Sequence, residues 1–174
     1  LHDQVGLRRG DRLATMLFNH DVTVVLYFAA WISGITVVPI NVEEPTDKKR
    51  FILEHSEASA VCCWHSYGEE VKGMQRDLPA LRHVIALNDD SFMEDKSQGA
   101  RGETTHRPLA PGHASHAGLL EDEALIVYTS GTTGPPKGVV LTVENLLTDA
   151  DAIADWHHFG VNDRLMCVLP IHHV

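Results

Sequence analysis

The sequence predicts an α/β fold in which a mainly parallel sheet is flanked by helices. Short apolar runs rich in β-branched residues alternate along the chain with segments of helical pattern, which is typical of a βαβ series. A glycine-rich loop then separates two further strand-like runs. The 174 residues are enough to build one hydrophobic core.

The first half of the chain supplies four predicted strands. The expected order is strand 11–18, helix 22–33, strand 36–40, helix 46–56, strand 60–64, helix 66–77 (interrupted by Gly73) and strand 83–87. Asn19 and Asp21 are candidate caps of the first helix. Phe51, Ile52 and His55 are expected to mark the inner face of the second helix.

Residues 22–40 carry no charge, and nineteen such residues are close to the length that spans a bilayer. Gly34 interrupts this stretch, however, and the β-branched run that follows it favours a strand. We therefore predict a buried helix followed by a buried strand, with no membrane span.

Residues 88–120 contain several glycines and prolines with mixed charge, which predicts a long surface loop. His106, His113 and His116 lie in this loop and are interpreted as solvated side chains rather than as metal ligands.

The last third of the chain contains a second series of elements. The expected order is an apolar run 124–127, strand 138–142, a helix that ends near Trp156, and strand 164–169. Thr142 is the predicted N-cap of this helix, and Leu146, Leu147, Ala150 and Ile153 give it an inner stripe.

Composition limits the compartment and the partners. The net charge of −10 argues against nucleic acid as a partner and requires that any phosphate site be built locally. The three cysteines form no disulfide framework and the first residues show no signal peptide, so we expect a cytoplasmic protein.

The loop YTSGTTGPPKG (128–138) is the strongest chemical signal in the chain. Its glycines permit close backbone approach, while its hydroxyl groups and one lysine can contact the oxygens of a polyphosphate. It is not a Walker A loop, because two prolines precede the lysine and a strand rather than a helix follows it. The alternative is a plain connection between two strands.

This loop resembles the signature phosphate loop of the adenylate-forming (AMP-binding) superfamily, to which acyl-CoA synthetases and the adenylation domains of peptide synthetases belong. The stretches 6–12, 28–34 and 37–41 are similar to the early core of that family, and LPIHHV (169–174) is similar to its next motif. The resemblance covers nearly the whole chain, and 88–120 is the part in which such proteins vary. Val143 is a departure, since many members have histidine there.

The resemblance implies an acyl-CoA synthetase type of ligase that uses ATP, Mg²⁺ and CoA. In that reaction a carboxylate attacks the α-phosphate of ATP and expels pyrophosphate, and a thiol then takes the acyl group. The implied phosphate-binding residues are Thr129, Ser130, Gly131, Thr132, Thr133, Gly134, Lys137 and Gly138. His172 and His173 are the implied candidates for the acyl pocket, and no catalytic residue or metal ligand is assigned within the chain.

Family members also have later segments for adenine, ribose, Mg²⁺ and a catalytic lysine, none of which is found in this sequence. We therefore expect an internal piece of the large N-terminal domain, inactive alone, with a βαβ part (1–87), a variable loop (88–120) and a phosphate-loop segment (121–174). The expected substrate is a fatty or aryl carboxylic acid. Two alternatives stay open: an amino-acid adenylation domain of a peptide synthetase, and a truncated non-catalytic module that binds nucleotide.

Overall fold

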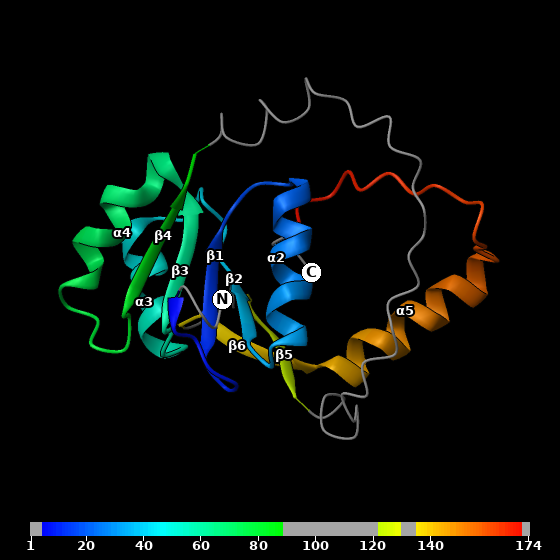
Figure 1. The fold of residues 1–174 in the computed structure, drawn as a ribbon, viewed down its shortest axis with the longest axis horizontal. Coiled ribbons are helices and arrows are strands. Elements are labelled where there is room, and N and C mark those ends of the chain that lie inside the picture. The colour runs from blue at the N-terminus through cyan, green and yellow to red at the C-terminus, as the bar shows by residue number, and fades with distance from the viewer. Residues whose placement is uncertain (1–4, 89–121, 130–134, 172–174) are drawn as a thin grey trace.

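A computed structural model describes residues 5–88, 122–129 and 135–171, which form one sheet with helices on both faces (Figure 1). The elements are β1 (Arg12–Met16), α2 (Asp21–Ile32), β2 (Thr36–Pro39), α3 (Thr46–His55), β3 (Ala60–Trp64), η1 (His65–Tyr67), α4 (Gly68–Gln75), β4 (His83–Leu87), β5 (Glu123–Thr129), β6 (Lys137–Thr142) and α5 (Val143–His157). The predicted loop at 88–120, with its three histidines, lies outside the described residues except for Asn88.

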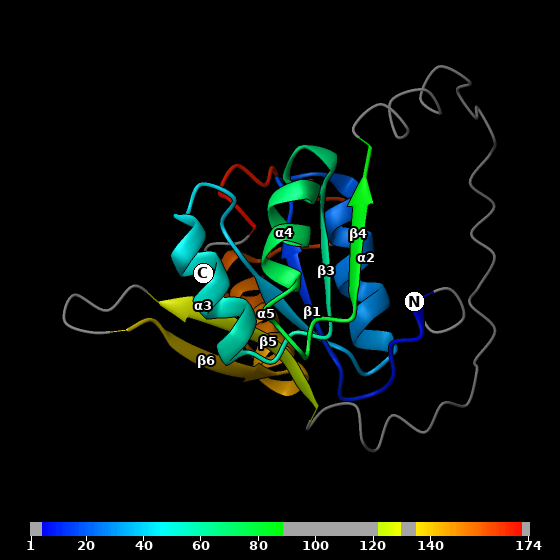
Figure 2. The same ribbon diagram turned by 90° about the vertical axis from the view of Figure 1, so that its left-hand side faces the viewer.

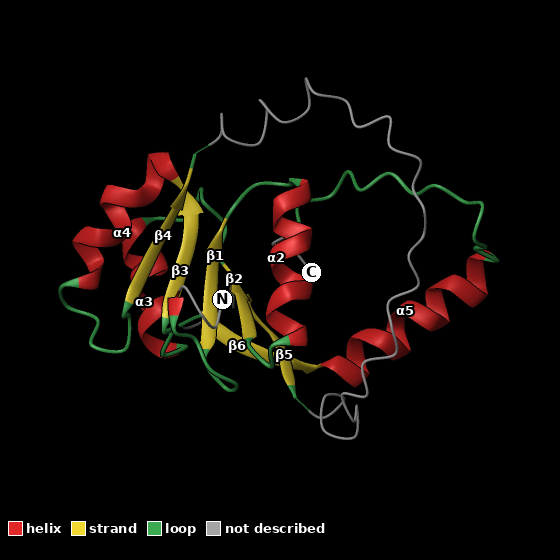
Figure 3. Cartoon of the chain, viewed as in Figure 1, coloured by secondary structure: helices red, strands yellow, loops and turns green. Residues whose placement is uncertain are grey.

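The sheet has the order β4-β3-β1-β2-β5-β6, and every neighbouring pair except β5–β6 is parallel. Strands β2 and β3 are buried along their whole length, because helices cover both faces of a parallel sheet. The predicted mainly parallel α/β fold is thus confirmed (Figure 3).

Each face of the sheet has its own core. Helix α2 packs on one face, where Tyr27 and Ala30 join Leu13, Val37 and other residues of the strands. Helices α3 and α4 pack on the opposite face, where Ile52 and Val71 belong to the other cluster (Figure 2). Successive helices therefore leave β1 and β2 towards opposite faces, and this divergence places the candidate site described below.

The uncharged stretch 22–40 forms α2 and β2, as predicted. No helix in the described part of the chain is long and apolar enough to cross a membrane. The predicted caps of α2 are wrong, because its N-cap is His20, whose Nδ1 accepts a hydrogen bond from the Val22 amide at 3.2 Å. Asp21 is the first helical residue, and Asn19 has a different role.

The inner face predicted for α3 is only partly right. Ile52 is buried and Phe51 is half-buried, but His55 is exposed, and the buried residues also include Lys49 and Leu53. The buried face of α3 differs from the predicted one because the helix packs against α4 as well as against the sheet. This packing brings Lys49 beside Glu70. Gly73 does not interrupt α4 but lies within it.

The last third of the chain differs most from expectation. Thr142 caps α5 as predicted, in a capping box with Asn145. No residue of α5 is buried, however, so its predicted inner stripe is not covered in this structure. The strand predicted at 164–169 is absent, and these residues are exposed. A strand needs a neighbouring strand for its backbone groups, whereas this segment returns from α5 towards the start of α2 outside the sheet (Figure 1).

Candidate functional site

The carboxyl ends of β1, β2 and β5 lie side by side, because these three strands are adjacent and parallel. The chain leaves β1 for α2 on one face and leaves β2 for α3 on the other. Where such connections diverge, they leave a crevice beyond the carboxyl ends of the strands, and this is the usual ligand site of open α/β sheets.

A cavity of about 450 Å³ occupies this crevice. Its lining comes from the residues after β1, the residues after β2, and the segment that follows α5: Phe18, Asn19, Asn41, Val42, Glu43, Val168 and Pro170. The walls combine apolar side chains with two amides and one carboxylate, a composition that suits a small organic ligand with a polar end.

Asn19 joins two of these walls. Its Nδ2 donates a hydrogen bond to the Leu169 carbonyl at 2.7 Å, and its Oδ1 accepts one from the Ile171 amide, also at 2.7 Å. Sequence reasoning assigned Asn19 to a helix cap and missed this contact, since no local pattern links residues 150 positions apart. The candidate pocket residues His172 and His173 follow Ile171 directly but lie outside the described residues.

The two strand residues that flank the glycine-rich loop, Thr129 and Lys137, lie at the same edge of the sheet. Strands β5 and β6 pair antiparallel, with Thr129 opposite Lys137 and Tyr128 opposite Gly138, so the predicted strand on each side of the loop is confirmed. The side chains of Thr129 and Lys137 are exposed. The other predicted phosphate-binding residues lie outside the described part of the chain: Ser130, Gly131, Thr132, Thr133 and Gly134.

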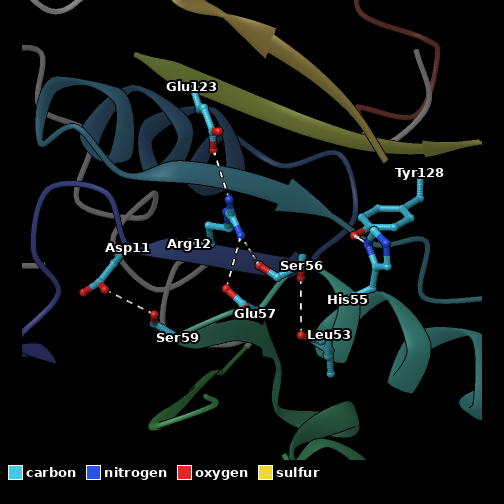
Figure 4. Close-up of polar contacts among 9 residues, drawn as sticks. All are labelled: Asp11, Arg12, Leu53, His55, Ser56, Glu57, Ser59, Glu123 and Tyr128. Atoms are coloured by element: carbon cyan, nitrogen blue, oxygen red, sulfur yellow. Dashed lines mark hydrogen bonds and ion pairs between the residues drawn. The ribbon is translucent and has the colours of Figure 1, made fainter. Parts of the chain in front are cut away.

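A tyrosine and a histidine support the base of this hairpin (Figure 4). The hydroxyl of Tyr128 lies 2.8 Å from Nδ1 of His55, the last residue of α3. Burial raises the pKa of Tyr128, so the phenol stays protonated at neutral pH and can donate this hydrogen bond. The pair ties the strand before the glycine-rich loop to the helix beneath it.

Gly138 is required by this packing. A Cβ at position 138 would lie 3.1 Å from Cγ2 of Ile126 and 3.2 Å from Cζ of Tyr128, closer than such atoms normally approach. We expect Gly138→Ala to displace the Tyr128 ring and to lower the free energy of unfolding by about 1 kcal/mol. Urea denaturation followed by circular dichroism measures the change.

Gly73→Ala is the matched control. No atom lies within 4 Å of a Cβ there, and the residue is inside α4, so alanine should stabilise the protein by about 0.5–1 kcal/mol. Equal effects of the two substitutions would contradict the packing role of Gly138.

Arg12 connects the other end of β5 to β1 and α3 (Figure 4). Its guanidinium donates to the Ser56 carbonyl at 3.0 Å and to Oε2 of Glu123 at 3.4 Å, and it lies 3.8 Å from Glu57. The antiparallel hairpin is therefore fixed to the parallel part of the sheet by side chains at both ends of β5.

The two cysteines of β3 are not available as nucleophiles at this edge, whereas Cys167, next to Val168 of the cavity wall, is exposed. Cys62 and Cys63 are buried in β3, and burial raises their pKa to about 12 and about 11, so both remain neutral thiols. Nor do three His, Cys, Asp or Glu side chains gather to hold a metal ion in the part of the chain that the structure describes. The arrangement can supply binding and orientation of reactants.

The family model of the AMP-binding enzyme matches residues 1–174. The chain therefore belongs to the AMP-binding enzyme family, as its motifs indicate.

Its relatives include several CoA ligases. The chain is 30% identical to sulfoacetate–CoA ligase of Cupriavidus necator over 97% of its own length and 32% of that protein. It is 29% identical to the mitochondrial malonate–CoA ligase of Mus musculus, over 98% of its length and 27% of that protein. The chain thus spans about a third of the length of the curated relatives it matches.

A solved structure with the same fold is ATP-bound MatB from Rhodopseudomonas palustris. It superimposes with a TM-score of 0.74 at 27% identity, over 97% of this chain and 32% of that one.

Proposed function

We propose that this chain is the part of an ATP-dependent acid–thiol ligase that holds the phosphates of ATP and forms one wall of the acid-binding pocket. One observation carries the proposal: the hairpin with the glycine-rich loop and the cavity open at the same edge of the sheet, beyond adjacent strands. A ligand at this edge can place its phosphates at the hairpin and a neighbouring acid in the cavity.

In the proposed reaction, a carboxylate oxygen of the acid attacks the α-phosphorus of ATP, and the bond to pyrophosphate breaks. A thiol, which we propose is that of CoA, then attacks the acyl carbon and releases AMP. Both nucleophiles belong to substrates, so the proposed reaction requires no nucleophilic side chain of the protein, and the buried Cys62 and Cys63 are neutral thiols.

The loop between β5 and β6 supplies the phosphate contacts in this proposal. Backbone amides and the hydroxyls of Thr129, Ser130, Thr132 and Thr133 would donate to the β- and γ-phosphates, with Lys137 as a mobile cation. The protein carries a net charge of −10, so these local donors must offset the repulsion that its field exerts on ATP. Mg²⁺ would add charge stabilisation when bound.

The acid is proposed to be a fatty or aryl acid that enters the cavity beside Phe18 and Val168. The names of the two relatives add short acids with a second acidic group, sulfoacetate and malonate, to the candidates that need testing. An amino acid is the less favoured alternative, since both reported relatives are CoA ligases rather than peptide synthetases.

We further propose that the chain is one incomplete domain within a longer cytoplasmic protein. Its parts are the βαβ region (1–87), a variable loop (88–120) and the phosphate-loop segment (121–174). The chain covers 32% and 27% of the two relatives, and α5 with the segment after it exposes apolar side chains such as Ile153, Leu165 and Met166. The remainder of the ligase would cover these side chains.

ATP–pyrophosphate exchange by the full-length ligase tests the function. We expect exchange of labelled pyrophosphate into ATP only when a suitable acid is present, in a panel of fatty, aryl, amino, malonic and sulfoacetic acids. The 174 residues alone should give no acyl-AMP. Absence of acid-dependent exchange across the whole panel would contradict the proposal, and exchange with amino acids alone would favour the peptide-synthetase alternative.

A further inference from the structure

Asn19, in the connection between β1 and α2, forms hydrogen bonds to the segment after α5. Within the described chain, the hydrogen bonds that anchor residues 164–171 to other elements both involve Asn19, at the Leu169 carbonyl and the Ile171 amide. Leu165, Met166, Val168 and Leu169 are largely exposed, so packing holds the segment weakly up to its last described residue. Ile171 then packs against the core beside α2.

The amide group is suited to this contact in a way that few side chains are. It presents one donor and one acceptor side by side, so it pairs with a carbonyl and an amide as a neighbouring strand would. The segment gains a strand-like partner although the sheet provides no strand for it. Aspartate has the same shape but two acceptors, and would place a carboxylate oxygen against the Leu169 carbonyl.

The contact also shapes the cavity. Val168 and Pro170, on either side of Leu169, form the wall that faces Asn41 and Glu43, while Asn19 itself lines the crevice. The hydrogen bonds of Asn19 therefore fix the separation between the wall after α5 and the ends of β1 and β2. A change in this separation alters the volume available to a ligand.

We propose that Asn19 is a positioning residue that sets the size of the acid-binding pocket by holding residues 169–171. This inference rests on the proposed function, because it assigns the cavity to the acid. It predicts that loss of the Asn19 contacts changes which acid is preferred, while the ATP site at the β5–β6 hairpin is unaffected.

The test uses Asn19→Asp in the full-length ligase, with Asn162→Asp as the control. Asn162 is exposed after α5 and does not line the cavity, so its replacement adds the same charge without removing the hydrogen bonds between Asn19 and residues 169–171. Loss of one hydrogen bond corresponds to a change of about tenfold in an equilibrium constant. For Asn19→Asp we expect KM for the best acid to rise about tenfold, KM for ATP to change less than twofold, and the ratio of kcat/KM between long and short acids to shift. Asn162→Asp should resemble the wild type.

Hydrogen exchange separates this inference from the proposed function. In Asn19→Leu, which removes the acceptor of the Ile171 amide as well as the donor to the Leu169 carbonyl, that amide should exchange about tenfold faster, whether or not the protein is a ligase. Unchanged exchange of this amide would show that Asn19 does not hold residues 169–171. Faster exchange with an unchanged acid preference, or with equal changes in KM for acid and ATP, would overturn its role in specificity. A wild-type protein without acid-dependent pyrophosphate exchange would instead contradict the proposed function.

Discussion

Replacing Thr133 with alanine is expected to lower the rate of acyl-adenylate formation by about 10²–10³-fold, if the loop between β5 and β6 holds the leaving pyrophosphate. The expectation follows from the chemistry of the site. Negative charge grows on the pyrophosphate as its bond to the α-phosphorus breaks, and a fixed hydroxyl donor stabilises that charge more than it stabilises bound ATP. The measurement is pyrophosphate release by the full-length ligase at saturating acid and ATP.

Thr148→Ala is the matched control, because Thr148 has the same side chain on the exposed surface of α5. Its rate should stay within twofold of the wild type. Lys137→Ala should also slow release, and mainly at low ATP, because Lys137 is an exposed cation at the start of β6. Unchanged pyrophosphate release in both Thr133→Ala and Lys137→Ala would remove the phosphate-binding assignment from this loop.

The second large effect concerns stability. Glu70→Ala is expected to lower the free energy of unfolding by about 3 kcal/mol, because it leaves the ammonium group of Lys49 buried without a counter-charge. The side chain of Lys49 is 6% exposed, and its Nζ lies 3.2 Å and 3.3 Å from the two carboxylate oxygens of Glu70. Thr46 donates a further hydrogen bond to Glu70 at 2.7 Å. Urea denaturation followed by circular dichroism gives the change.

The two partners should not be equivalent. Glu70 is 27% exposed, so Lys49→Met leaves a carboxylate that water and Thr46 can still solvate, and should cost only about 1 kcal/mol. The double variant Lys49→Met/Glu70→Leu should be more stable than Glu70→Ala, since no charge is left buried. If Lys49→Met lowers the free energy of unfolding more than Glu70→Ala does, the unpaired charge of Lys49 is not the main cost of breaking this pair.

Local chemistry in the sequence was sufficient for most of the fold. The alternation of β-branched runs with helical segments predicted β1 to β4 and the parallel sheet, because two-sided burial makes such strands apolar throughout. Glycines and prolines at 131–138 predicted a connection between strands, and the flanking pair β5–β6 confirms those strands. Thr142 was recognised as a cap because a hydroxyl before a helix satisfies nearby amides.

The sequence by itself determined the elements and the loop chemistry, because these depend on residues near one another in the chain. Only the tertiary structure decided which distant groups meet: Asn19 with residues 169–171, and Tyr128 with His55. It also decided that 164–169 is no strand and that α5 buries no residue, since apolar pattern shows what a segment could bury but not whether a neighbour is present. The cavity beyond the carboxyl ends of β1 and β2 likewise depends on strand order, which is a property of the whole sheet rather than of any one segment.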